Sequence, residues 1–219
     1  MRLMSILFLA FLAAITAPDR ASAQTEIGKV TKLLGAASQA MDENVTPLTA
    51  GSPVYEDALI ETGDDARLEI VFIDSSQITL GERARLVMDD LVYSFEASET
   101  GVVAQSFRIL DGTFLFLSGA VARTDHDAVS VSTPVATIGI RGTGFFGGPL
   151  AAGMPPGELH YGFMLTEGAI DVSSVDGTVT LDEVNEGTFL PMSGQAAPTP
   201  PTQWQQEAID EAYASVAFN

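Results

Sequence analysis

The chain has 219 residues, with 29 Asp and Glu against 10 Lys and Arg, no cysteine, and a formal net charge of −19 at neutral pH. Proteins contact nucleic-acid phosphates and anionic lipid headgroups through clustered cations, so this charge balance excludes nucleic-acid binding. Without disulfides the fold depends on a hydrophobic core, and a chain of this length is long enough to bury one.

The N terminus predicts an export signal. Arg2 gives a positive start, residues 3–17 are apolar, and Ala21-Ser22-Ala23 has the small-residue pattern of a cleavage site. The apolar run is shorter than the roughly 20 residues of a membrane-spanning helix. We therefore expect cleavage after Ala23 (signal peptide 1–23) and a protein that is not integral to a membrane. Its expected location is the periplasm of a Gram-negative bacterium or the medium; an uncleaved anchor is the alternative.

Residues 24–192 show the period-two alternation of β-strands. In residues 67–73 the apolar side chains Leu68, Ile70 and Phe72 fall on one face. Similar short runs follow at 77–80, 85–88, 105–110, 113–117, 163–172, 176–181 and 186–190. Turn residues such as Asp111-Gly112 separate them. This pattern predicts an all-β domain over residues 24–193, either a β-solenoid-like roll or a twisted sandwich of short strands.

Two breaks rich in glycine or proline follow the middle of the chain. Residues 147–157 predict a mobile surface loop, and residues 193–202 predict an extended linker. Within the last segment (194–219), one stripe at helical spacing contains Trp204, Ala208, Ile209, Ala212, Tyr213 and Val216. The stripe predicts a short amphipathic helix that either docks on the β domain or binds a partner through residues such as Tyr213.

The sequence carries no enzyme signal. It has two histidines, no thiol and no G-x-S-x-G motif. Neighbouring side chains of an extended segment point to opposite faces, so Asp125-His126-Asp127 favours a surface loop over a metal site. His160, beside Tyr161, favours a partly buried structural role. The acidic pairs at 64–65 and 89–90 lack the spacing of a calcium loop. We expect no catalytic residue, no metal site and no cofactor.

The most distinctive stretch is residues 131–145, a β-branched run broken by Pro134, Gly139, Gly142 and Gly144. Glycine inside a strand marks a bulge or a tight corner, so the stretch predicts a strand folded round a corner. Its central part, Thr-Pro-Val-Ala-Thr-Ile-Gly-Ile-Arg-Gly-Thr at 133–143, resembles the TPxATIGIRGT-like signature of the FecR domain family.

Two further landmarks support this resemblance. Residues 51–63 resemble the family's G-x-x-V-x-x-G-D-x-I-x-T-G opening, and residues 72–80 resemble its F-x-D-G-S-x-L-x-L segment. Ser75 replaces the usual glycine after Asp74, and Glu56 precedes Asp57 where the family tends to have Gly-Asp. Both departures concern turn geometry. The resemblance covers about residues 30–148 and implies a twisted roll of short strands.

The resemblance also implies a function. FecR-type domains are best known from regulators of iron uptake, in which a cytoplasmic anti-sigma segment and one spanning helix precede a periplasmic domain that senses an outer-membrane receptor. This chain resembles the periplasmic domain without those parts. We expect an exported, non-enzymatic binding module that senses or scaffolds in the cell envelope through a protein partner, either an outer-membrane receptor or a membrane regulator.

Binding of an envelope polysaccharide or peptidoglycan is the alternative, which an exposed row of aromatic side chains would favour; a carbohydrate-active enzyme, which would need two acids in a deep cleft, is a third reading. Arg141, the one cation of the signature, either ties turn carbonyls or a carboxylate together or recognises an anionic group. The candidate binding residues are therefore Arg141, Thr143 and Tyr213. Strand edges, the 147–157 loop and the C-terminal helix are the expected contact surfaces.

Overall fold

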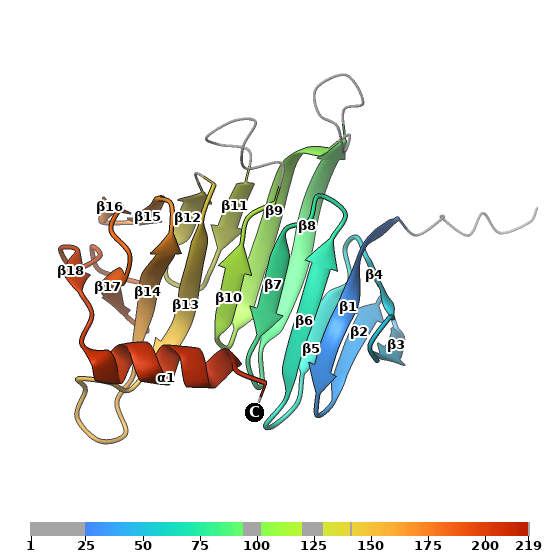
Figure 1. Ribbon diagram of the computed structural model, residues 1–219, viewed down its shortest axis with the longest axis horizontal. Helices are drawn as coiled ribbons and strands as arrows, with labels where there is room; N and C mark the ends of the chain where they lie inside the picture. Colours follow the sequence, from blue (N-terminus) through green and yellow to red (C-terminus); the bar gives the residue numbers. More distant parts are fainter. Residues whose placement is uncertain (1–24, 94–101, 120–128, 141, 219) are drawn as a thin grey trace, which may run out of the picture.

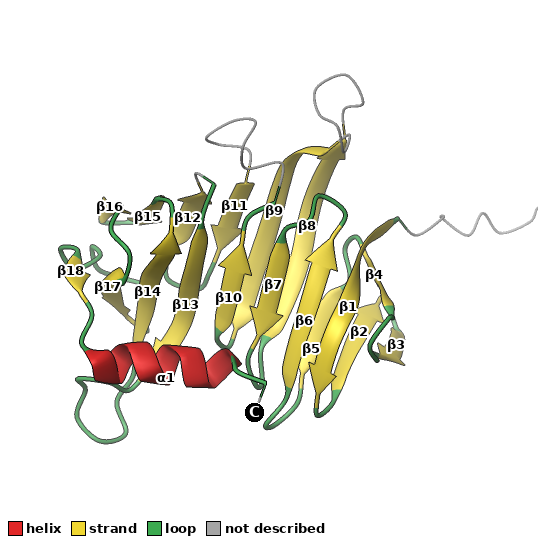
Figure 2. Ribbon diagram, in the orientation of Figure 1, coloured by secondary structure: helices red, strands yellow, loops and turns green. Residues whose placement is uncertain are grey.

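The computed structural model describes residues 25–93, 102–119, 129–140 and 142–218. They form two sheets that face each other, with a helix, α1 (Gln206–Val216), on the outer face of one of them (Figures 1 and 2). The prediction of an all-β fold with a short C-terminal helix is confirmed. No helix within the described ranges has the length and apolar character needed to cross a bilayer.

Each sheet has nine strands. Sheet A runs, in spatial order, β18 (Thr202–Gln203), β17 (Glu186–Pro191), β14 (His160–Glu167), β13 (Gly144–Leu150), β10 (Phe114–Leu117), β7 (Gln77–Leu80), β6 (Arg67–Phe72), β1 (Glu26–Leu34) and β4 (Pro53–Tyr55). Sheet B runs β16 (Gly177–Leu181), β15 (Ile170–Ser174), β12 (Thr137–Ile140), β11 (Val129–Ser132), β9 (Val102–Asp111), β8 (Arg85–Tyr93), β5 (Leu59–Thr62), β2 (Ala37–Met41) and β3 (Asn44–Pro47).

The chain passes back and forth between the sheets as it advances. Hairpins β6–β7 and β13–β14 lie in sheet A, whereas β8–β9, β11–β12 and β15–β16 lie in sheet B. Neighbouring strands are antiparallel except β9 and β11, which are parallel. The result is a flattened roll whose blue end carries β3 and β4 and whose red end carries β16, β18 and α1 (Figure 1).

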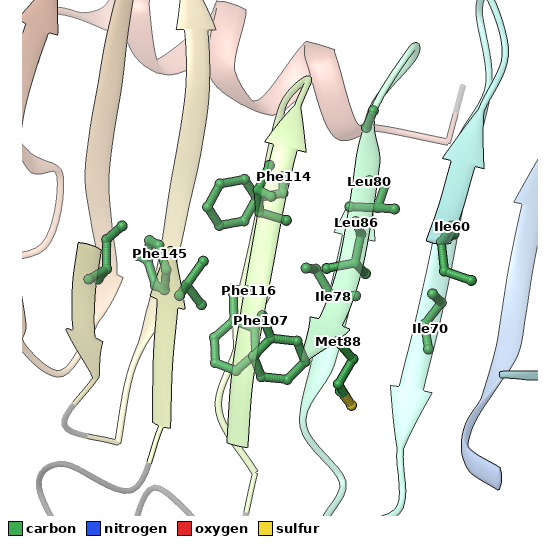
Figure 3. Close-up of a cluster of buried hydrophobic side chains, with 14 of the residues drawn as sticks. Ile60, Ile70, Ile78, Leu80, Leu86, Met88, Phe107, Phe114, Phe116 and Phe145 are labelled. Atoms are coloured by element: carbon green, nitrogen blue, oxygen red, sulfur yellow. The ribbon is translucent and has the colours of Figure 1, made fainter. Parts of the chain in front are cut away.

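Aromatic side chains join the two sheets at the centre of the core. Phe107 of β9 lies with its ring centroid 5.1 Å from Phe72 of β6 and 5.3 Å from Phe116 of β10. Phe145 of β13 packs against Phe114 and Phe116 at 5.6 and 5.9 Å. Figure 3 shows the rings of Phe107, Phe114, Phe116 and Phe145. Because Phe107 belongs to sheet B and its two ring partners to sheet A, it bridges the layers.

The distinctive 131–145 stretch forms the predicted corner. Strands β11 and β12 are joined by a turn in which the Thr133 hydroxyl accepts the Ala136 N–H at 3.1 Å. The chain then crosses from sheet B to sheet A, with Gly142 at a φ of 66° that favours glycine. At Gly144, an added Cβ would lie 2.7 Å from the Leu117 side chain. The chain therefore turns at Gly142, and Gly144 begins β13 in close contact with Leu117, whereas Gly139 lies within β12, where a Cβ has open space.

The predicted start of the next loop is wrong. Gly147 and Gly148 lie in β13, paired with Phe163 and Gly162 of β14, and the loop comprises residues 151–159. The glycines serve packing instead of a turn, since a Cβ at Gly147 would lie 2.6 Å from the Phe114 ring. Pro149 is tolerated within the sheet because the pairing with β10 ends at Gly147.

One of the two departures from the family pattern coincides with left-handed backbone, since Ser75 has a φ of 68°. The other, Glu56, has no positive φ, whereas its neighbour Asp57 has a φ of 61°. A side chain in this region costs about 1–2 kcal/mol, although Asp tolerates it better than most residues. The turn at Ser75 is nevertheless intact, because its N–H donates to Phe72 O at 3.0 Å and Asp74 Oδ1 accepts the Ser76 hydroxyl at 2.6 Å.

Replacing Ser75 with glycine is expected to raise the free energy of unfolding by about 0.5–1 kcal/mol. Glycine adopts this φ without a steric cost, and its greater entropy in the unfolded chain offsets part of the gain. Chemical denaturation measures the change. Ser76→Gly is the control and should destabilise, since Ser76 is fully buried and its hydroxyl donates to Asp74. Loss of stability in Ser75→Gly would contradict this account of the turn.

Candidate partner-binding groove

Helix α1 packs on the outer face of sheet A. Its buried residues Ala208, Ala212 and Val216, with Trp204 just before the helix, contact Phe146, Leu150 and Met164. The helix therefore docks on the β domain, one of the two arrangements that its apolar stripe predicted. Small alanine side chains let it lie close to the strands. The buried stripe is narrower than predicted because Tyr213 is 42% exposed.

Two glycines of sheet A form the seat of Trp204. A Cβ at Gly162 of β14 would lie 2.7 Å from the indole, and one at Gly187 of β17 would overlap the indole nitrogen. Glycine at both positions leaves a flat floor on which the ring lies. Trp204 is the single tryptophan of the chain and is 6% exposed.

A stack of three aromatic rings extends from this seat. Phe189 of β17 lies parallel to Trp204, with centroids 4.8 Å apart, and His160 of β14 stacks on Phe189 at 4.0 Å. The rings cover one another's faces, so this row offers no open aromatic platform of the kind that binds a sugar. This stack is therefore not the exposed aromatic row that would favour polysaccharide binding, because its rings pack against one another.

Polar contacts fasten the helix at its middle and near its C-terminal end. The Glu211 carboxylate accepts the backbone N–H groups of Ala151 and Ala152, each at 2.8 Å, and so ties the 151–159 loop to the helix. Near the other end, Arg67 of β6 donates to the Ala214 carbonyl at 3.4 Å. A cation near the last turn of a helix also interacts favourably with the helix dipole.

Between the loop, the start of α1 and the ends of β14 and β17 lies a hollow of about 560 Å³, which we call the α1 groove. Its apolar lining consists of Ala152, Met154, Phe189, Trp204 and Ala208. Its polar lining comprises Gly153, His160, Thr202, Gln203, Gln205 and Glu207. A concave, mainly apolar surface with a few polar groups at its rim is typical of a binding site.

His160 is held in its neutral form at physiological pH. Burial lowers its pKa below the ordinary value of 6.5, and this effect outweighs the charge of Glu211 and a backbone hydrogen bond with Ala152, which both raise it. Its Nε2 atom is buried and has no hydrogen-bond partner. Because burial disfavours the protonated imidazole, His160 acts as a packing residue of the groove.

We expect the melting temperature to fall as the pH decreases from 7 to 5, and to fall less in His160→Gln. Because the folded-state pKa of His160 is depressed, the unfolded chain takes up the proton first below pH 6.5, and stability decreases with pH until the folded-state pKa is passed. Thermal unfolding of both proteins at each pH gives the difference. An identical pH dependence would show that His160 carries no burial penalty.

The three predicted binding residues lie in different places. Arg141 lies outside the described residues. Thr143 is fully buried, and its hydroxyl donates to Ala169 O at 2.6 Å and accepts the Ala169 N–H at 3.1 Å. Thr143 thus holds the corner together and is not accessible to a ligand, which corrects its assignment as a binding residue. Tyr213 lies on the exposed side of α1 and remains a candidate contact.

The acidic groups considered for metal binding give no centre in the described part of the chain, where no three His, Asp or Glu side chains could hold one ion together. Asp64 and Asp65 lie in the turn between β5 and β6, with Asp64 3.6 Å from Arg83. Asp89 and Asp90 fall within β8. The Asp125-His126-Asp127 trio lies outside the described residues.

Charge is distributed unevenly along the roll. Residues 142–219 contain ten Asp and Glu residues and no Lys or Arg. The described cations belong to the β1–β9 part, where ion pairs such as Lys32–Glu69 at 2.9 Å and Arg85–Glu61 at 3.0 Å form. The segment that forms β13–β18 and α1 therefore contributes only negative charges from these residue types.

Comparisons with known proteins agree with this fold. A crystal structure of a proposed anti-sigma factor from Parabacteroides distasonis ATCC 8503 superposes with a TM-score of 0.50 at 12% identity, over 69% of this chain and 62% of that one. A second structure of a proposed anti-sigma factor from that organism gives a TM-score of 0.48 at 11% identity over the same shares. This chain thus spans less than two thirds of those proteins. No curated protein matches its sequence.

The family comparison is more specific. The FecR protein family matches residues 58–154, from the start of β5 to the loop beside the α1 groove. The matched part includes the 133–143 signature and the turn at Ser75, and it leaves β14–β18 and α1 outside. The match over residues 58–154 confirms the resemblance to the FecR family that the 133–143 signature predicted.

Proposed function

We propose that this chain is an exported regulatory module that acts in the cell envelope by binding a protein partner, without catalysing a reaction. The observation that carries the proposal is the FecR match over residues 58–154. The Parabacteroides distasonis structure that superposes on this chain is that of a proposed anti-sigma factor, and its name indicates a regulatory protein. The proposed role is regulatory, and the proposal further specifies export, a location in the cell envelope and a protein partner.

The chemistry of the α1 groove supports binding over catalysis. Its histidine is neutral, stacked on Phe189 and without a partner for Nε2. The lining offers packing surface and amide groups, and its one carboxylate is that of Glu207. General acid–base chemistry needs a group that exchanges protons near a reacting atom, and a desolvated imidazole packed against a ring is poorly suited to that task.

Export is supported by the sequence of residues 2–23 and is testable directly. We expect the protein recovered from the periplasmic fraction to begin at Gln24, as measured by N-terminal sequencing of the chain expressed from its own start codon. Replacing Ala21 and Ala23 with bulky residues should block processing at this site, since the cleavage site requires small side chains. Recovery of a cytoplasmic protein beginning at Met1 would contradict export.

The regulatory role is tested by deleting the gene and comparing transcript levels with those of the parent strain. We expect a limited set of genes to change and to return to normal when the intact chain is supplied in trans. A chain without residues 1–23 is the matched control and should fail to restore them if action in the envelope is required. Unchanged transcripts under envelope stress and iron limitation would contradict a regulatory role.

A further inference from the structure

We propose that the α1 groove binds a cationic amphipathic segment of the protein partner, with an apolar side chain inside the groove and Lys or Arg side chains against its rim. This inference rests on the proposed function and names the chemistry of the partner.

The size and lining of the groove fit a large apolar side chain. Its volume of about 560 Å³ falls in the range of sites that enclose small ligands. Phe189 and Trp204 form a rigid wall of the groove because their rings stack on each other. Met154 of the 151–159 loop also lines the groove, and its flexible side chain can adapt to the bound group. Rigid aromatic walls lose little side-chain entropy on binding, which favours affinity.

The rim has acidic and amide groups. Glu207 lies in the first turn of α1, where its charge offsets the partial positive charge of the helix N terminus. The amides of Gln203 and Gln205 line the same opening. Carboxylate and amide oxygens accept hydrogen bonds from ammonium and guanidinium groups. The rim therefore suits Lys or Arg side chains that flank an apolar anchor.

The charge of the surrounding surface selects the same partner. The groove is built largely from residues 151–208, inside the stretch that has ten acids and no Lys or Arg. Such a field attracts cationic segments and speeds their association. It repels nucleic acids and anionic membranes. It also repels a second copy of this chain, because a two-fold interface would bring two anionic ends together.

Fluorescence of the mature full chain with synthetic peptides tests this inference. The probe is a twelve-residue peptide that alternates leucine with lysine, and its matched control carries glutamate at each lysine position. Trp204 lines the groove and is the single tryptophan, so its emission reports occupancy of this site. We expect saturable binding of the lysine peptide with a change in Trp204 emission, and no binding of the glutamate peptide.

Two charge reversals locate the site. Glu207→Lys should weaken binding of the lysine peptide about five- to tenfold, because an attraction becomes a repulsion at the rim. Asp176→Lys changes the net charge equally in the exposed turn between β15 and β16 of sheet B, outside the lining of the groove, and should weaken binding less than about twofold. Met154→Asn removes apolar lining without a charge and should also weaken binding.

Three results would overturn the inference: no binding of the lysine peptide, equal loss in Glu207→Lys and Asp176→Lys, or binding without a response from Trp204. The emission spectrum of each variant without peptide, compared with that of the parent chain, shows whether Trp204 still packs against sheet A. The inference and the proposed function fail separately, because a regulatory protein that engages its partner at another surface would still alter transcripts on deletion.

Discussion

Replacing Phe107 with alanine is expected to lower the free energy of unfolding by about 3–5 kcal/mol. Phe107 is fully buried in β9 and is the ring of sheet B that contacts both Phe72 and Phe116 of sheet A. Its removal leaves a cavity between two sheets whose spacing is fixed by many other side chains. Total stabilities of about 5–15 kcal/mol are usual, so such a loss is a large fraction. Chemical denaturation monitored by circular dichroism measures it.

Phe189→Ala is the matched control for this prediction. Phe189 lies on the outer face of sheet A and packs against Trp204 and His160, outside the core between the sheets. We expect a smaller loss of stability together with a change in Trp204 emission. Equal losses of unfolding free energy in the two variants would contradict the prediction that Phe107 contributes more to stability than Phe189.

Gly187→Ala is expected to destabilise the protein by about 2–3 kcal/mol and to shift Trp204 emission to longer wavelength. The added methyl group would overlap the indole and lie 2.6 Å from the Phe163 carbonyl oxygen, so either Trp204 or the backbone must move. Overpacking of this kind typically lowers the free energy of unfolding by about 1–3 kcal/mol. We expect a value in the upper part of this range because the Phe163 backbone cannot move aside as a flexible side chain could.

Gly177→Ala provides the comparison, since its Cβ would meet Ala197 at an ordinary 3.4 Å. This variant should keep both the stability and the Trp204 emission of the parent chain. If Gly187→Ala behaved in the same way, the close seat of Trp204 on sheet A would be wrong.

The strands were predictable where apolar residues alternate. In β6 the alternation of Leu68, Ile70 and Phe72 matches their full or near-full burial, because this face meets the opposite sheet. The other face was less predictable, since its Glu69 is only 8% exposed and bonds to Thr31 and Lys32. The Asp111-Gly112 turn was likewise visible, with Gly112 at a φ of 84°. The sheet to which each strand belongs depends on contacts between distant residues, which the local pattern does not encode.

Glycines were the main source of error. A glycine that makes a turn and a glycine that makes room for a ring are the same letter in the sequence. The glycine- and proline-rich pattern predicts a loop at Gly147, which instead lies in β13 against Phe114. The same kind of pattern predicts a bulge or corner at Gly139, where a Cβ has open space. Gly142, with its positive φ, matched the expectation of a corner.

The α1 groove was not predicted because its parts are far apart in the chain. Phe189 and Trp204 are separated by the proline-containing segment, and His160 precedes both by almost thirty residues or more. The signals that could have pointed to it were the single tryptophan before an amphipathic helix and the absence of Lys and Arg after residue 141. Tyr213 was placed on the buried stripe by spacing alone, yet the stripe of this helix is narrow because alanine supplies most of it.

Photo-crosslinking in the native cell envelope tests the central claim most directly. Probes replace Met154, which lines the α1 groove from the 151–159 loop, and Tyr213, which is 42% exposed on α1. A third probe replaces Val45, which is 66% exposed in β3 at the opposite end of the roll (Figure 1). The account predicts that one protein, identified by mass spectrometry, crosslinks to the first two probes and not to the third. Recovery of glycan or peptidoglycan fragments alone, or the same products from all three probes, would contradict it.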